Sequence, residues 1–160
     1  MLWMMAGRRT NPRRTLAAFG APLMVPPRVE MPLEEAVVRA LVSTRRDSRL
    51  LLALPVVLLK NAGKLHLRRL VRKAKERGVE AELGMFLDLA AKFGRRPALS
   101  MAARKLHPRE GAPRYYPRLL GGVYEKQLAD ERTPAVAARW GFRMNATEAD
   151  LRGFVRKHLG

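Results

Sequence analysis

A row of positive charges recurs at the spacing of helical turns between residues 64 and 78, KLHLRRLVRKAKERG. Residues three and four positions apart share one side of an α-helix. The cations that share such a side here are Lys64, Arg68, Arg72 and Lys75. Like charges at this spacing destabilise an isolated helix, and the stretch holds one acid, Glu76. The pattern therefore favours an anion bound along this side of the helix.

Phosphate binding is the chemistry that such a row can perform. An arginine guanidinium donates parallel hydrogen bonds to phosphate oxygens, whereas a lysine ammonium acts as a point charge, and arginine outnumbers lysine in this chain. We therefore expect the stretch to contact nucleic-acid phosphates. The residues expected to do so are Lys64, Arg68, Arg69, Arg72, Lys73 and Lys75. A solvated amphipathic face without a partner is the alternative interpretation.

Two tyrosines lie between arginines in the main loop of the chain, residues 108–118, PREGAPRYYPR. Aromatic rings beside arginines can stack on unpaired bases. Arg114 and Arg118 are therefore included among the expected nucleic-acid contacts. Two tyrosines do not make a stacking platform by themselves, so we expect Tyr115 or Tyr116 to pack beneath the loop instead.

Residues 133–160, TPAVAARWGFRMNATEADLRGFVRKHLG, show the most organised local pattern. Thr133 and Pro134 are typical of a helix start. Thr147 followed by Asp150 is close to a capping box and begins a second helix. Two helices joined by a glycine-bearing turn, the second edged with cations, have the layout of a helix-turn-helix. The expected nucleic-acid contacts of the second helix are Arg152, Arg156 and Lys157.

The segments VAARWGF and LRGFVRKHLG resemble the second helix-turn-helix of the arabinose-operon-regulator family of transcription factors. The residues that carry the resemblance are Gly141, Phe142, Leu151, Val155, Arg156, Lys157, Leu159 and Gly160. It covers 28 of the 160 residues. The turn is about three residues longer than the family's, and Leu151 and Val155 stand where the family has aromatic residues. The resemblance implies double-stranded DNA, rather than RNA, as the partner.

Residue patterns that would indicate catalysis or metal binding are missing from the sequence. There is no cysteine, and the three histidines lie far apart without an H-E-x-x-H pattern. No paired carboxylates, glycine-rich phosphate loop or nucleophile elbow occurs. We therefore expect a protein that is not an enzyme, with no catalytic residue, metal ligand or cofactor. The lack of cysteine fits a reducing compartment, and we expect the cytoplasm.

The overall charge sets the class of partner. Lysine and arginine total 32 against 14 acids, which makes the formal net charge +18. A chain this basic seeks polyanions. Nucleic acid is the expected partner. The alternative is a non-catalytic interaction protein, such as an antitoxin or a complex subunit, that binds an acidic protein.

The chain also contains ten consecutive apolar residues, Leu50–Leu59. As a helix they span about 15 Å, which is half of the roughly 30 Å of a bilayer's hydrocarbon core. Pro55 interrupts the helical hydrogen bonds, so we expect a kink or a split there. The run is therefore expected to form a central core helix and not a transmembrane segment.

Helical periodicity continues through the chain after Met31 and predicts an all-α fold. We expect a compact bundle of about six to seven short helices, with a helical core over residues 32–107 and a C-terminal helical part over residues 108–160. Residues 1–31 are expected to be a disordered basic arm. A targeting segment and an over-extended translation start are the alternatives for residues 1–30.

Overall fold

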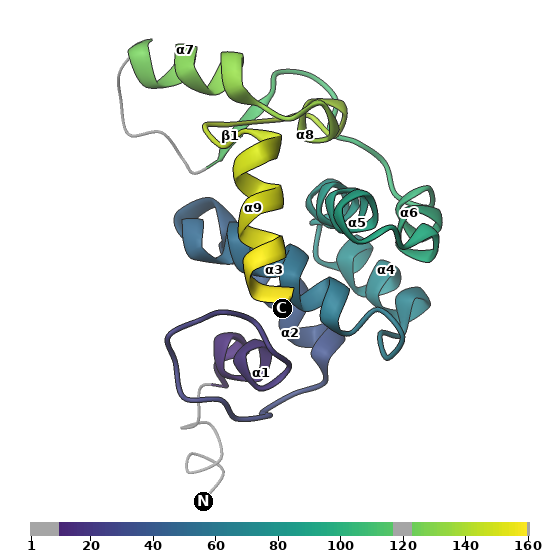
Figure 1. Ribbon diagram of the computed structural model, residues 1–160. Helices are drawn as coiled ribbons and strands as arrows, with labels where there is room; N and C mark the ends of the chain where they lie inside the picture. Colours follow the sequence, from purple (N-terminus) through teal and green to yellow (C-terminus); the bar gives the residue numbers. More distant parts are fainter. Residues whose placement is uncertain (1–9, 117–122, 160) are drawn as a thin grey trace, which may run out of the picture.

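The computed structural model describes residues 10–116 and 123–159 and is mostly helical (Figure 1). Its helices are α1 (Pro12–Ala18), α2 (Leu33–Ser43), α3 (Ser48–Lys60), α4 (Leu67–Glu76), α5 (Glu80–Gly94), α6 (Pro97–Ala103), α7 (Val123–Arg132), α8 (Ala135–Arg139) and α9 (Glu148–Leu159). A 3-10 turn, η2 (Thr44–Arg46), joins α2 to α3. The expected all-α class is confirmed. The described part of the chain holds nine α-helices, more than the six to seven expected.

The apolar run forms the centre of the core, as expected. Leu50, Leu54 and Leu58 on α3 are all buried, and α3 packs against α2, α5 and α9. Side-chain burial of this kind contributes about 1.5–3 kcal/mol per leucine before entropy is counted. Asp47 caps the helix by accepting a hydrogen bond from the Arg49 backbone N–H at 3.0 Å. The helix continues through Pro55 and is not split there.

Residues 10–31, the described part of the expected arm, are built into the fold. Helix α1 packs against α2, and Leu16 on α1 is fully buried. Asn61, at the end of α3, donates a side-chain hydrogen bond to the Phe19 carbonyl oxygen at 2.9 Å. The expectation of a flexible arm therefore does not hold for this segment, because its apolar residues find a surface on the helical core. Residues 1–9 of the arm lie outside the described residues.

Two short strands, β1 (Arg114–Tyr116) and β2 (Phe142–Met144), form a parallel pair next to α7 and α8. Tyr116 is buried, its ring lies 5.1 Å from the ring of Phe142, and its hydroxyl bonds the Thr44 hydroxyl at 3.0 Å. One tyrosine of the loop therefore packs inside, as expected. The strands escape sequence analysis because three residues are too few to show an alternating pattern.

Trp140, directly after α8, joins the C-terminal part to α5. Its indole N–H donates to a carboxylate oxygen of Asp88 at 2.7 Å, and the indole ring lies on Gly84. A Cβ at Gly84 would overlap the ring, so only glycine allows this close approach. Helix α8 is thereby held against α5.

Candidate nucleic-acid interface

Helix α4 carries most of the expected phosphate contacts. Leu70, Val71 and Ala74 form its buried stripe, which packs towards α2 and α5. The His66 imidazole caps the helix by accepting the Arg69 backbone N–H at 3.2 Å. Because the buried stripe is narrow, the cations of α4 divide into two rows that flank it.

The inner row consists of Arg69, Lys73 and Arg77 and faces α2. The Lys73 ammonium lies 2.8 Å and the Arg77 guanidinium 3.1 Å from the Glu35 carboxylate. Arg69 pairs with the buried Glu34 at 3.9 Å. The hydrogen bonds from Lys73 and then from Arg39 lower the pKa of Glu35 below its usual value. Two of the expected phosphate contacts, Arg69 and Lys73, are therefore already paired with acids of the protein itself.

The outer row consists of Arg68, Arg72 and Lys75 on α4, together with Lys64, and all four side chains are exposed. Lys64 lies in the turn that precedes α4, so it does not share a side of the helix with the other three as the sequence indicated. Arg72 lies 3.9 Å from Glu76, and both of these side chains are about two-thirds exposed to solvent. Among the described residues, no acid pairs with the other three members of the row. The 1.5 Å rise per residue spreads Arg68, Arg72 and Lys75 over about 10 Å of helix. The outer row therefore presents cations to solvent at regular intervals.

The described arginine and tyrosines of the 108–118 loop are less available for nucleic-acid contacts than the sequence indicated. Arg114 is half-buried on β1, and its guanidinium lies 3.8 Å from the buried carboxylate of Glu82. Arg118 lies outside the described residues. The Tyr115 hydroxyl donates to Asp130 at 2.8 Å, and Lys126 lies over the Tyr115 ring at 5.5 Å. Burial and the Asp130 carboxylate raise the pKa of the Tyr115 phenol, which keeps it a donor.

The last helix, α9, presents a second basic surface. Leu151 and Val155 are buried where α9 packs on α3, whereas Arg156 and Lys157 are exposed. Arg152 is half-buried, pairs with Glu148 at 3.7 Å and lies 5.7 Å from the Phe93 ring. Arg152 is thus less available to a ligand than its two neighbours.

The connection between α8 and α9 differs from a simple turn. Residues 140–147 contain strand β2, and α8 packs on α5 and β2 whereas α9 packs on α3. The expected capping box is present: the Thr147 and Asp150 side chains each accept a 3.1 Å hydrogen bond from the other's backbone N–H. Hydrogen bonding of the Asp150 carboxylate to the Thr147 backbone N–H, and then to the Thr147 side chain, lowers the pKa of Asp150. Helix α9 therefore begins where the sequence indicated.

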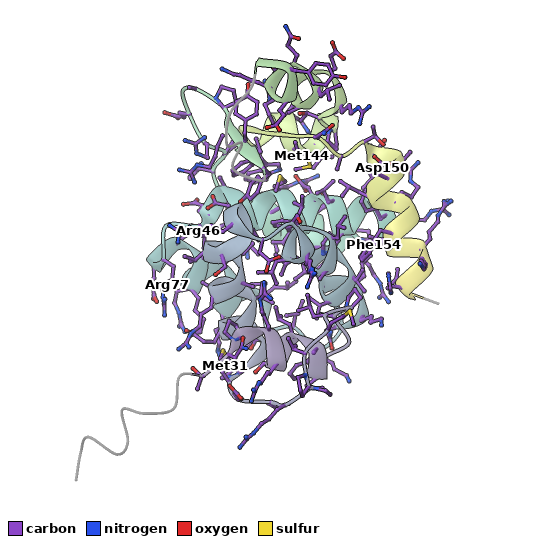
Figure 2. All side chains as sticks on the ribbon, turned by 90° about the vertical axis from the view of Figure 1, so that its left-hand side faces the viewer. Met31, Arg46, Arg77, Met144, Asp150 and Phe154 are labelled. Atoms are coloured by element: carbon purple, nitrogen blue, oxygen red, sulfur yellow. The ribbon has the colours of Figure 1, made fainter. Side chains whose placement is uncertain are left out.

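The two basic surfaces lie on opposite sides of the molecule. In Figure 2, Arg77 at the end of α4 lies at one side, and Asp150 and Phe154 of α9 lie at the other. The structure therefore does not bring all of the expected site residues together.

A third basic region was not identified from the sequence. A groove of about 710 Å³ lies between the end of α5, helix α6 and helix α8. Its cations are Lys92, Arg95, Arg96, Arg104 and Arg139. The adjacent arginines after Gly94 are a visible signal in the sequence, but Arg104 and Arg139 reach the same groove only through the packing of α6 and α8 on α5.

No protein-family model, curated protein or solved structure shows a significant match to this chain. Within residues 10–116 and 123–159, no group of three or more histidine, aspartate or glutamate side chains is placed to hold a metal ion. None of the helices in these ranges has both the length and the apolar character needed to cross a bilayer.

Proposed function

We propose that the protein binds nucleic acid, with duplex DNA as the preferred form, through phosphate contacts made by the outer row of α4. The observation that carries the proposal is the division of the α4 cations into two rows. The inner row is paired with Glu34 and Glu35 of α2, whereas the outer row faces solvent with little internal compensation.

The inner row supports this function by setting the orientation of the helix. Arg69 and Lys73 of α4 and Arg77 directly after it pair with two adjacent acids on α2, so the ion pairs and the buried stripe of α4 favour the same orientation of the helix. The outer row is then held in one direction before any ligand arrives. Phosphates that replace the counterions of DNA at such a row release those counterions, which drives binding and makes it depend on salt.

Helix α9 is the basis for proposing duplex DNA rather than RNA. Arg156 and Lys157 are exposed there, and the resemblance of residues 133–160 to a helix-turn-helix favours duplex DNA over RNA. Since α9 and α4 lie on opposite sides of the molecule, we treat their contacts as independent. Changes in α9 are therefore expected to alter binding without removing the contribution of the outer row.

The test measures the affinity for a generic DNA duplex as a function of salt. Arg68→Gln combined with Arg72→Gln removes two outer-row cations, and glutamine preserves the helical propensity of the positions. The slope of log K against log salt should become shallower by about 1.8, since each phosphate contact adds about 0.9. Fluorescence anisotropy over a range of salt concentrations gives this slope directly.

A matched control separates contact from overall charge. Arg28→Gln combined with Arg46→Gln removes the same two charges from exposed positions outside α4. The control should keep the slope of the parent protein to within about 0.5, because it loses long-range attraction and no phosphate contact. Equal slopes for the two double variants would show that the outer row has no special part in binding.

A second candidate function is the binding of an acidic protein. Helix α4 already holds one acidic helix, because its inner row pairs with Glu34 and Glu35 of α2. An acidic helix of another protein could pair with the outer row in the same way. Co-purification after nuclease treatment distinguishes the two: a stoichiometric acidic protein that duplex DNA fails to displace would favour this second candidate.

A further inference from the structure

The groove between α5, α6 and α8 has the volume of a small-molecule site. Its volume of about 710 Å³ lies within the roughly 300–1,000 Å³ that such sites usually occupy. Trp140 lies next to the lining residue Asp88, and its bond to Asp88 and its contact with Gly84 hold α8 against α5. The groove is thus part of the packed body of the protein.

The charge of the lining is strongly unbalanced. Five cations face one acid, Asp88. The two Asp88 oxygens already accept hydrogen bonds, one from the Ser100 hydroxyl at 3.4 Å and one from Trp140 at 2.7 Å. Lys92 is paired with Glu148 of α9. The four groove arginines are Arg95, Arg96, Arg104 and Arg139, and all of them are exposed and form no ion pair with any of the described acids.

Arg95 occupies a backbone position at which arginine is disfavoured. It ends α5 in the left-handed conformation, with φ 52° and ψ 50°, and is the one non-glycine residue of the described chain with a positive φ. Glycine is the usual residue at this place, because a Cβ crowds the following carbonyl. Glycine would relieve the backbone at this position, where the structure instead has a charged residue in the groove lining.

The groove also has an apolar portion. Met101 on α6 is 62% exposed, and Val136, Ala91 and Pro97 lie in the same lining. Exposed methionine is common on adaptable binding surfaces and makes favourable contacts with aromatic rings. A ligand that matches both portions combines an anionic group with a flat organic group.

We propose that this groove binds a nucleoside phosphate, with the arginines on the phosphate and Met101 with its apolar neighbours on the base. Guanidinium groups bind phosphate through paired hydrogen bonds, and four arginines line this one groove. The ligand comes either from free nucleotides or from the phosphorylated end of a nucleic-acid strand. The proposal goes beyond the function assigned to the outer row, because it concerns a separate site on other helices.

Isothermal titration calorimetry with AMP tests the site. One AMP per chain should bind with a Kd of about 1 mM or lower in dilute buffer. Adenosine lacks the phosphate and inorganic phosphate lacks the base, so each should bind at least about tenfold more weakly than AMP. No saturable AMP binding, or equal affinity for AMP and inorganic phosphate, would overturn the proposal.

Two variants separate the site from the fold. Arg95→Gly removes a guanidinium and relieves the left-handed backbone, so AMP affinity should fall about tenfold while the melting temperature stays the same or rises by about 2–4 °C. Arg104→Gln combined with Arg139→Gln should also weaken AMP about tenfold or more. The assignment would be refuted if Arg95→Gly and the double variant both bound AMP as tightly as the parent protein. It would also be refuted if the control, Arg28→Gln with Arg46→Gln, lost as much AMP affinity as the groove variants.

The source of the nucleotide and the independence of the two sites follow from further arms of the experiment. A single-stranded oligonucleotide that binds more tightly with a 5′-phosphate than without one would identify a strand end as the ligand. AMP binding without this difference would identify a free nucleotide, and either result supports the site.

The two sites are tested for independence with the outer-row variant. Arg68→Gln with Arg72→Gln should leave AMP affinity unchanged. If the salt slope of duplex binding is unchanged in Arg68→Gln with Arg72→Gln, while the groove variants bind AMP more weakly, only the outer-row proposal is refuted. If that slope becomes shallower, while the groove variants bind AMP as well as the parent protein, only the groove proposal is refuted.

Discussion

Replacement of Glu35 by glutamine is expected to weaken the fold and strengthen nucleic-acid binding at the same time. The Glu35 side chain is 16% exposed and accepts hydrogen bonds from Arg39 at 3.0 Å, Lys73 at 2.8 Å and Arg77 at 3.1 Å. Glu35→Gln removes the charge that holds these three cations while it keeps one acceptor oxygen. Lys73 and Arg77 of the inner row then become available to phosphates, while Arg69 stays paired with Glu34.

The size of the stability loss depends on how exposed the three cations that bind Glu35 are. Hydrogen bonds to charged groups contribute about 1.5–3 kcal/mol when sheltered, and exposed ion pairs about 0.2–1 kcal/mol. The three partners are 27–51% exposed, so screening is substantial. We expect the free energy of unfolding to fall by about 1–2 kcal/mol, which lowers the melting temperature by about 2–8 °C in a chain of this length. Urea unfolding and calorimetry measure both quantities.

The effect of Glu35→Gln should depend on pH in one direction. The pKa of Glu35 is lower in the folded protein than in the unfolded chain, so the unfolded state binds its proton first as pH falls. The contribution of Glu35 is therefore complete above about pH 5 and is lost as pH falls through the lowered folded pKa. The difference in stability between parent and variant should shrink in acid.

The same variant should increase the salt dependence of duplex binding. Freed Lys73 and Arg77 add up to two phosphate contacts, which steepens the slope of log K against log salt by about 0.9–1.8. Glu131→Gln on α7 is the matched control, since it removes one acid from an exposed position. If Glu35→Gln and Glu131→Gln change stability and slope alike, the inner row does not hold α4 as described.

Three further changes test the packing that positions these surfaces. Gly84→Ala forces a methyl group into the Trp140 ring and should destabilise the fold by about 1–3 kcal/mol, with a shift in tryptophan fluorescence; an unperturbed spectrum would contradict the close contact. Leu54→Ala, in the centre of α3, should lower the free energy of unfolding by about 2–5 kcal/mol in urea, and a change below about 1 kcal/mol would place this residue outside the core. Asn61→Ala removes the hydrogen bond to Phe19 and should speed limited proteolysis of residues 10–31 ahead of global unfolding; an unchanged cleavage rate would show that α1 is held by other contacts.

Local signals in the sequence located most of the helices. The apolar run predicted a buried helix that became α3, and the Thr147 and Asp150 pair marked the start of α9. The 64–78 stretch predicted a strongly basic helix, which is α4. These features depend on residues within a few positions of each other, because caps, breakers and periodicity act over one or two helical turns.

The arm and the strands show where local signals fail. Residues 10–31 have a composition typical of a flexible segment, yet Leu16 is buried because α2 and the end of α3 offer it a surface. Strands β1 and β2 pair only because α7 and α8 bring the chain back beside Tyr116. The hydrogen bonding of a three-residue strand is decided by its distant neighbour and not by its own sequence.

By itself, the sequence determined the helical class, the burial of most residues of Leu50–Leu59 and the excess of positive charge that favours a polyanion. Tertiary structure alone decided which cations remain free. Glu35 and Lys73 are 38 positions apart, and Asp88 and Trp140 are 52 apart. The physical reason is that periodicity predicts which face of a helix is buried but not which helix packs on that face. The acids that pair with the cations of a helix belong to that neighbouring helix, so the pairing is decided by the tertiary structure.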